Sequence, residues 1–328
     1  MATGDRERLS LADFEGASSE FDQLVASRGG QYCSSSGWII PARAAFNPKS
    51  TGWIFSQSDC FTVLCRSMHE QGFWVLTPLE SLWGLSCPLV GEPQASVSLL
   101  LSKLARYRED WRFTLLTGIA PGGGLAKEIL ASLATRFRCR VQHGTPRFVA
   151  NLEGGVEKYL GRRTANFRRA IRKSQRYAEG LGIKYEHLHK ASLAEPRTYQ
   201  RILSVESKSW KGIEGVGITE SPMRDFYELM LKKPETNYEL RVSFAKLEVE
   251  DVGYVLGAVF NQTYRGLQFS YVDSVRSLSI GSLLQMMEIE RLCNDGVLSY
   301  DLGGTGVDYK RRWSDEIVPS LAVVVENN

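Results

Sequence analysis

One stretch in the C-terminal third of the chain constrains the fold more than any other. Two apolar, aromatic runs, Tyr254–Phe260 and Gly266–Val272, flank a polar turn and predict a pair of antiparallel strands. A turn of small residues at Arg276–Ser282 leads into a helix predicted over Leu283–Leu292, and a strand follows around Leu298–Leu302. A strand, such a turn and a helix N-terminus together favour anion binding, because free backbone N–H groups and the helix dipole attract negative charge. The stretch therefore predicts a site for a phosphate-bearing ligand.

Strand-like and helical segments alternate in both halves of the chain. In the first half, for example, Phe61–Arg66 has the pattern of a strand and Val97–Arg106 that of a helix. Elements of the same two kinds recur in the second half. We therefore expect a mixed α/β fold made of two similar domains, residues 1–152 and 153–328.

The composition is that of a soluble globular protein, with 328 residues of which 43% are hydrophobic and 23% charged. No run approaches the ~18 uncharged apolar residues of a membrane span, and the charged N-terminus lacks the apolar core of a secretion signal. Six cysteines form no Cys-x-x-Cys pair and only four histidines are present, so we expect no metal site. These features favour a cytoplasmic protein with reduced thiols.

Positive charge is concentrated in one segment, although the formal net charge is only +3. Eight Lys and Arg residues, and no acid, lie between Glu157 and Glu179, in a helix predicted over Val156–Glu179. A run of charge is usually a solvated helix face. Without acids, however, pairs four residues apart cannot neutralise this one. We therefore expect Arg169 and Arg172 to bind an anionic partner, such as a nucleotide or the acceptor end of a tRNA.

The C-terminal half resembles the GNAT acyltransferase superfamily, in which an Arg or Gln precedes a Gly-x-Gly turn that binds the donor. Here the turn has the spacing Arg276-x-x-Ser279-x-Gly281, with Ser279 where the first glycine usually stands. The longer pattern is similar to the FemAB/CelD-like branch, whose Ser-Pro-Gly turn is Ser279-Ile280-Gly281 here, without the proline. Three further segments match that branch: Asp301-Leu302-Gly303, Tyr309-Lys310 with Trp313, and Trp210-Lys211-Gly212. The resemblance implies two tandem GNAT-like domains, each a mostly antiparallel sheet flanked by helices, with the donor site in the second.

The resemblance also implies roles for particular residues. The donor's pyrophosphate would be held by the turn, through Arg276, Ser279, Ile280, Gly281 and Ser282. Lys310, which follows an aromatic residue as in FemAB-like enzymes, would stabilise the oxyanion of acyl transfer.

A base must deprotonate an amine acceptor before the amine can attack. Asp273, directly after the second predicted strand, is the first possibility, although it could equally be a turn-initiating residue. Glu206 is another, on a predicted helix where a solvated position is the simpler interpretation. Tyr309 could act as a general acid, although aromatic residues more often serve in packing.

The leading hypothesis is an N-acyltransferase that moves an acyl group directly from acyl-CoA to a small-molecule or peptide amine. One alternative is a FemAB-type enzyme that uses aminoacyl-tRNA to form peptide bonds. Another is a non-catalytic binding module that keeps a degenerate GNAT fold.

Overall fold

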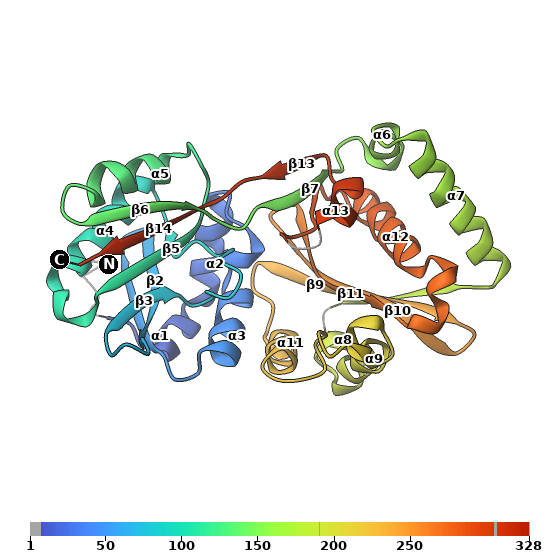
Figure 1. Cartoon of the computed structure of the whole chain (residues 1–328), viewed down its shortest axis with the longest axis horizontal. Coiled ribbons are helices and arrows are strands. Elements are labelled where there is room, and N and C mark those ends of the chain that lie inside the picture. The colour runs from blue at the N-terminus through green and yellow to red at the C-terminus, as the bar shows by residue number, and fades with distance from the viewer. Residues whose placement is uncertain (1–7, 190, 305–306, 328) are drawn as a thin grey trace. The chain divides into compact units, whose positions relative to one another are not determined.

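The computed structural model describes residues 8–189, 191–304 and 307–327, which form two compact units (Figure 1). The first comprises residues 1–146 and 319–328, and the second residues 147–318. This division differs from the one expected at 152/153, for two reasons of strand pairing. The strand Arg147–Asn151 belongs to the second sheet, and the last strand of the chain, Leu321–Glu326, belongs to the first.

The first unit is built on a seven-stranded sheet in the order β1-β2-β3-β5-β14-β6, with β4 pairing to β2. Only β3 and β5 run parallel, and α4 lies between them in sequence. The elements are α1 (Leu11–Gly16), α2 (Ser18–Ser27), η1 (Tyr32–Ser34), α3 (Ser36–Phe46), β1 (Thr51–Gln57), β2 (Cys60–Met68), β3 (Trp74–Pro78), β4 (Leu89–Val90), α4 (Pro93–Arg106), η2 (Arg108–Asp110), β5 (Phe113–Ile119), α5 (Gly124–Glu128), η3 (Ile129–Leu133), β6 (Arg138–His143) and β14 (Leu321–Glu326).

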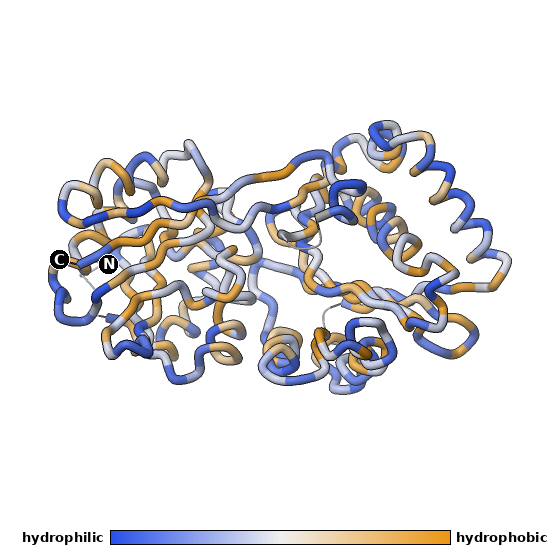
Figure 2. Tube along the Cα trace, viewed as in Figure 1, coloured by the Kyte–Doolittle hydropathy of each residue, from blue (hydrophilic) through white to orange (hydrophobic). Residues whose placement is uncertain are grey.

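The core of the first unit forms where α4 covers the sheet. The apolar face of α4 buries Val97, Leu100 and Leu104 against Trp53 and Phe55 of β1. Hydrophobic residues follow the strands of both sheets in Figure 2. Burial of this kind is the main source of stability in such a fold. None of the described helices is both long enough and apolar enough to cross a membrane.

The second unit contains another seven-stranded sheet, ordered β13-β7-β12-β11-β10-β9-β8. Its elements are β7 (Arg147–Asn151), α6 (Gly155–Gly161), α7 (Ala165–Gly180), β8 (Lys184–His189), α8 (Ala191–Ala194), α9 (Pro196–Ser207), α10 (Trp210–Ile213), α11 (Met223–Lys232), β9 (Tyr238–Leu247), β10 (Glu250–Phe260), β11 (Thr263–Tyr271), η4 (Asp273–Leu278), α12 (Ile280–Asn294), β12 (Ser299–Asp301), α13 (Val307–Trp313) and β13 (Glu316–Val318). Both sheets are mostly antiparallel and flanked by helices, which confirms the predicted fold class.

A hairpin and a crossover build the centre of the second sheet. β10 and β11 join through Asn261 and Gln262, both in the left-handed region (φ 49° and 58°), as a tight two-residue hairpin requires. The chain then crosses over through α12 to β12, which pairs parallel to β11 only from Thr263 to Arg265. The two strands are therefore unpaired with each other beyond Arg265. This split leaves the later part of β11 without β12 as its hydrogen-bonded neighbour.

The predicted basic helix is two helices in the structure. α6 ends at Gly161, and α7 begins at Ala165 after Thr164, whose hydroxyl accepts a hydrogen bond from Phe167 N (3.2 Å). This N-cap stabilises the new helix start. Because of this break, Arg162 and Arg163 lie in the link between the two helices and not on α7 itself.

Candidate functional site

The predicted phosphate turn lies where α12 begins. η4 follows β11, and Ser279 then adopts the left-handed conformation (φ 58°, ψ 30°) before α12 starts at Ile280. In the described part of the chain, the Ser279 side chain makes no capping hydrogen bond to the helix. The first N–H groups of an α-helix have no partner within the helix. The start of α12 therefore presents uncapped donors and the positive end of the helix dipole.

Gly281 allows α12 to approach β11 closely. A side-chain carbon at this position would lie 2.8 Å from Phe269 Cζ and 3.0 Å from Tyr271 Cε1, both on β11. Distances this short are not tolerated without movement of the rings. Gly281 thus has a packing reason to be glycine, in addition to its predicted place in the donor turn.

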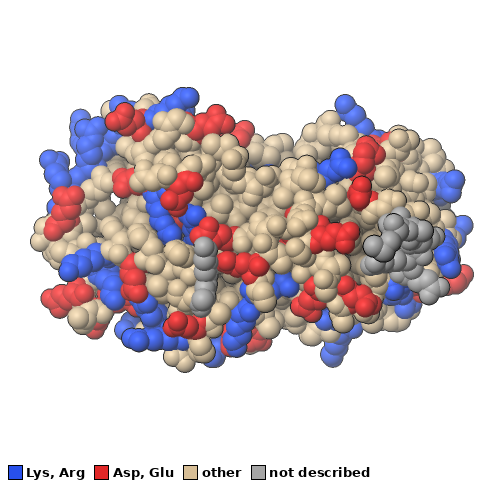
Figure 3. All heavy atoms as spheres, turned by 180° about the vertical axis from the view of Figure 1, so that it is seen from behind, with Lys and Arg blue, Asp and Glu red and all other residues tan. Residues whose placement is uncertain are grey.

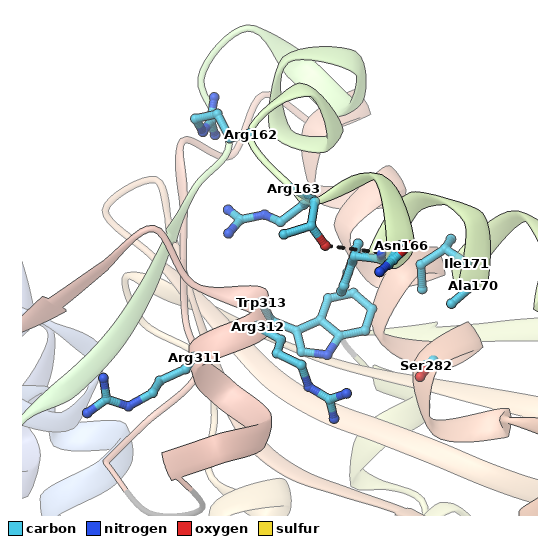
Figure 4. A pocket seen from close by; sticks show the side chains of 11 residues that line it. Arg162, Arg163, Asn166, Ala170, Ile171, Ser282, Arg311, Arg312 and Trp313 are labelled. Atoms are coloured by element: carbon cyan, nitrogen blue, oxygen red, sulfur yellow. Dashed lines mark hydrogen bonds between the residues drawn. The ribbon is translucent and has the colours of Figure 1, made fainter.

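A cavity of about 590 Å³ lies beside the start of α12. Its lining comes from the start of α7 and the residues before it, from α12 and from α13, as Figure 4 shows: Arg162, Arg163, Thr164, Asn166, Phe167, Ala170, Ile171, Ser282, Arg311, Arg312 and Trp313. Phe167 and Trp313 meet edge to face in its wall, with ring centroids 4.9 Å apart. The cavity therefore joins an apolar wall to four guanidinium groups, which suits a ligand that carries phosphate on an apolar or aromatic body.

The four arginines are held differently. Arg162 Nε lies 2.9 Å and Arg163 Nη2 2.6 Å from the carboxylate of Asp315, so one acid is shared by two cations. Arg311 and Arg312 are exposed, and neither forms an ion pair within the described residues. In Figure 4, Arg162 lies at the top of the group, and Arg311 lies at the lower left with its side chain extending away from Trp313. Positive charge at the cavity thus exceeds negative charge.

The cavity includes only part of the predicted donor set. Ser282 lines it, whereas Arg276, Ser279, Ile280 and Gly281 are not among its lining residues. Arg276 is exposed on η4. The four lining arginines were not singled out from the sequence, although the signal was present. Two belong to the basic segment, and Arg311 and Arg312 follow Lys310 directly.

Arg169 and Arg172 lie further along α7 and are exposed. α7 contacts both α12 and η4, so this basic helix runs beside the predicted phosphate turn. In the view from behind, Lys and Arg side chains gather at the end of the second unit where α7 lies (Figure 3). The basic surface extends beyond the cavity, as contact with a longer polyanion would require.

Lys310 lies at the split between β11 and β12. A side-chain carbon at Gly303, just after β12, would lie 3.2 Å from Lys310 Nζ and 3.0 Å from Arg265 Nη2. The pKa of Lys310 is lowered to about 8, mainly by burial and also by the neighbouring Arg265, against the opposing effect of Asp301. Gly303 itself has φ 85°, a conformation that favours glycine.

A buried ion cluster anchors this region. Asp301 accepts hydrogen bonds from Arg265 Nη1 (2.7 Å), Arg147 Nη1 (2.8 Å) and Gly303 N (2.8 Å). Burial alone would raise the pKa of Asp301, but the two arginines outweigh it and hold the pKa below its usual value. Asp301 thus fixes the glycine loop, Arg265 and the end of β12 together.

Glu206 is fully buried, so the solvated position expected from the sequence is wrong. Its carboxylate accepts a hydrogen bond from Tyr254 Oη (2.9 Å) and lies 3.2 Å from Lys211 Nζ. Lys211 in turn donates to Phe269 O (2.9 Å) and Gln268 Oε1 (3.1 Å), on the part of β11 beyond its pairing with β12. Burial lowers the pKa of Lys211, and Glu206 opposes this effect. Glu206 is therefore the counter-ion of Lys211, which binds the part of β11 beyond its pairing with β12.

The structure separates the other two predicted catalytic residues. The Tyr309 ring stacks on Phe269 (centroids 6.2 Å apart), its hydroxyl donates to Gln285 Oε1 (3.2 Å), and burial raises its pKa. Asp273 lies beyond the far end of β11, where its backbone N–H donates to Lys208 O (2.9 Å). Asp273 follows Arg265 by eight residues, which is roughly 26 Å along an extended strand at about 3.3 Å per residue.

Metal-binding side chains are not grouped in this region. Across residues 8–189, 191–304 and 307–327, no set of three or more His, Cys, Asp or Glu side chains is arranged to hold a metal ion. The groups that the structure does bring together are cations, glycines and aromatic rings.

Comparison with known proteins gives a family-model match and several similar structures. Residues 165–311 match the acetyltransferase (GNAT) domain. No curated protein matches the chain.

Among solved structures, FemX shares 10% identity over 97% of both chains (TM-score 0.66). The C-terminal domain of a putative lysylphosphatidylglycerol synthetase from Agrobacterium fabrum shares 12% identity over 94% of this chain and 92% of that one (TM-score 0.62). L-PGS from Bacillus licheniformis shares 12% identity over 84% of both (TM-score 0.57). These likenesses confirm the resemblance to the FemAB-like branch at the level of fold.

Proposed function

Because residues 165–311 form a GNAT domain in a chain with the FemX-like fold, we propose that this acyltransferase is an N-acyltransferase that takes its acyl group from a phosphate-bearing donor. The cavity at the start of α12 carries the proposal. It combines helix N-termini from α7 and α12 with four arginines and an aromatic wall. Phosphate oxygens accept hydrogen bonds from such groups, and a cation–phosphate hydrogen bond contributes about 1.5–3 kcal/mol.

The chemistry of transfer would take place at the split in the sheet. A strand edge freed from its neighbour lets a donor's thioester or ester lie beside β11, while the phosphates occupy the cavity. Lys310 lies at this split. On the β11 side of the split, Lys211 donates a hydrogen bond to Phe269 O and the Tyr309 ring stacks on the Phe269 ring. This centre would include Lys310 and Tyr309, for which the sequence predicted an oxyanion role and a general-acid role. Asp273 follows the end of β11, where its backbone N–H binds Lys208 O, and we do not assign it to this centre.

Acyl-CoA is our first choice of donor, because the cavity has the size and charge for a nucleotide pyrophosphate, and GNAT domains typically use such donors. The acceptor would be a small-molecule or peptide amine. The protein would need no metal for this reaction.

Aminoacyl-tRNA is the second choice of donor, and a specific observation favours it. The exposed cations of α7, including Arg169 and Arg172, continue past the cavity, and similar structures include FemX and the C-terminal domain of a putative lysylphosphatidylglycerol synthetase.

The test is to incubate the purified protein separately with labelled acetyl-CoA and with labelled aminoacyl-tRNA, in the presence of a panel of amines. We expect transfer of label from acetyl-CoA to an amine. Activity only with aminoacyl-tRNA would replace the first donor with the second. Absence of transfer from both, together with no heat on titration with CoA, would favour a non-catalytic binding module.

A cavity variant and its control sharpen this test. Arg311→Ala combined with Arg312→Ala should raise the donor's dissociation constant by about tenfold or more, because two phosphate contacts are lost. Arg136→Ala combined with Arg197→Ala removes two exposed arginines away from the cavity and should leave donor binding unchanged. Equal effects of the two pairs would mean that the cavity does not hold the donor.

A further inference from the structure

Lys310 is placed among cations without a counter-ion of its own. Arg265 from β11 and Arg147 from β7 share the single carboxylate of Asp301 from β12. Within the described residues, no carboxylate lies within ion-pair distance of Lys310 Nζ. The side chain is also largely buried against the glycine loop. The cluster therefore holds three basic groups and one acid.

This setting disfavours a charged ammonium for two separate physical reasons. Burial removes water from the cation, and no ion pair replaces that water. In addition, Arg265 Nη2 and Lys310 Nζ both lie close to the same bare face of Gly303, so they are at most about 6 Å apart, a range in which like charges disfavour each other. Arginine keeps its charge under all ordinary conditions, so lysine is the group that gives up its proton.

Acyl transfer to an amine requires a base, and the acids proposed from the sequence do not supply one at the split. Asp273 lies beyond the far end of β11. Glu206 is fully buried and bound to Lys211 and Tyr254. Lys310, in contrast, lies beside Gly303 and Arg265, where the pairing of β11 with β12 ends and where the reacting carbonyl would lie.

We propose that Lys310 is the proton acceptor of the reaction rather than a permanent cation on the oxyanion. This assignment rests on the proposed acyl transfer and adds the route of the protons. The neutral Lys310 amine takes one proton from the acceptor ammonium, and the freed amine attacks the carbonyl carbon of the thioester or ester. A carbon–nitrogen bond forms, and the carbon–sulfur or carbon–oxygen bond of the donor breaks. Lys310 then passes its proton to the leaving thiolate or alkoxide, and the second proton of the new amide nitrogen goes to solvent.

The Lys310 pKa of about 8 agrees with the role of general base, since such a base works best when its pKa is near the working pH. The charged groups that face Lys310 are Arg265 and Asp301, with Arg147 bound to the far side of Asp301. Arg265 raises the proportion of neutral amine. Asp301 opposes this effect, but its charge is already shared between the two arginines.

The first experiment needs no substrate. Lysines are reductively methylated with ¹³C, and the Lys310 signal is assigned by its loss in Lys310→Arg and followed by NMR from pH 6 to 11. We expect a midpoint near 8 for Lys310. Lys184, exposed on β8 and assigned by Lys184→Ala, is the matched control and should titrate at least one unit higher. A Lys310 midpoint at or above that of the control would overturn the proposal.

The second experiment separates a base from a cation. With the donor that supports transfer, wild-type kcat/KM should rise with pH to a plateau, with the midpoint found by NMR. Lys310→Arg keeps a cation but cannot accept a proton, so it should lose about 100-fold or more, whereas Lys184→Ala should match the wild type. Substantial activity of Lys310→Arg, or a rate that falls above pH 8, would assign Lys310 to the oxyanion instead. If neither donor reacts with the wild type while Lys310 titrates near 8, the proposed function fails and the lysine environment stands.

Discussion

Ser279 shows how a single residue departs from the family pattern at an energetic cost. Its left-handed backbone (φ 58°) is the conformation that glycine adopts most easily and that costs other residues about 1–2 kcal/mol. The sequence comparison identified the missing glycine, and the structure supplies the reason that a glycine is usual there.

Ser279→Gly should therefore stabilise the protein. Relief of the left-handed strain exceeds the added flexibility of the unfolded chain, which leaves a gain of up to about 1 kcal/mol in the free energy of unfolding. Denaturant unfolding measures it. Ser277→Gly, two residues earlier in the 3₁₀ helix η4, is the control and should give no gain. An equal gain from both variants would show that strain at Ser279 is not the cause.

Lys310→Met should also stabilise the fold while abolishing turnover. The folded-state pKa of about 8 lies below the ordinary value of 10.5. A charged Lys310 therefore lowers the free energy of unfolding at every pH below 8. Removal of the charge should raise the free energy of unfolding at pH 7 by about 1–3 kcal/mol. This advantage should shrink as the pH rises from 8 to 10.5, where wild-type Lys310 becomes neutral in both states. A gain that does not change with pH would point to packing rather than charge.

At the scale of elements, local patterns located the central helices and strands well and their joints less well. The strands predicted at Tyr254–Phe260 and Gly266–Val272 are β10 and β11, and the predicted helix Leu283–Leu292 lies inside α12. The basic segment was predicted as one helix because its periodicity hardly changes at Thr164, where a cap divides it. Arg311 and Arg312 were missed at the cavity because only the fold brings α13 next to the starts of α7 and α12.

The exposed face of α7 gives a prediction that distinguishes the two donors. Arg169→Ala combined with Arg172→Ala should weaken tRNA binding about tenfold, because a long polyanion would contact these exposed arginines on α7. The slope of log affinity against log salt concentration should fall by the equivalent of about two phosphate contacts. CoA, which the cavity alone would hold under the proposed function, should bind about as tightly as to the wild type. Affinities measured at several salt concentrations test both statements. Equal weakening of CoA and tRNA would mean that the donor's phosphates extend onto α7.

For the whole molecule, the order of segments along the chain does not show which distant strands pair in the same sheet. The apolar run Leu321–Glu326 has the pattern of a strand, but nothing local indicates its partners. In the structure β14 lies between β5 and β6, whose residues precede it by nearly two hundred positions. The same pairing explains why the first unit includes the C-terminus and why the expected division at 152/153 differs from the observed one.

Truncation after Val318 should consequently damage the first unit. The loss of β14 leaves β5 and β6 without their shared neighbour and removes Val323 and Val325 from the first core, where both are buried. We expect the cooperative unfolding of that unit to disappear or to shift to a much lower temperature. Differential scanning calorimetry of the truncated and full chains measures the change. An unaltered thermal profile would contradict the observed strand order.

The central claim is that the cavity at the start of α12 holds a phosphate-bearing acyl donor. Its most direct test is calorimetric titration of the wild type and of the Arg311→Ala, Arg312→Ala double variant with CoA and with aminoacyl-tRNA, at low salt. The account predicts that the wild type binds CoA with one site per chain, and that the double variant binds it about tenfold more weakly or worse. Failure of the wild type to bind either donor, or equal binding by wild type and double variant, would contradict it.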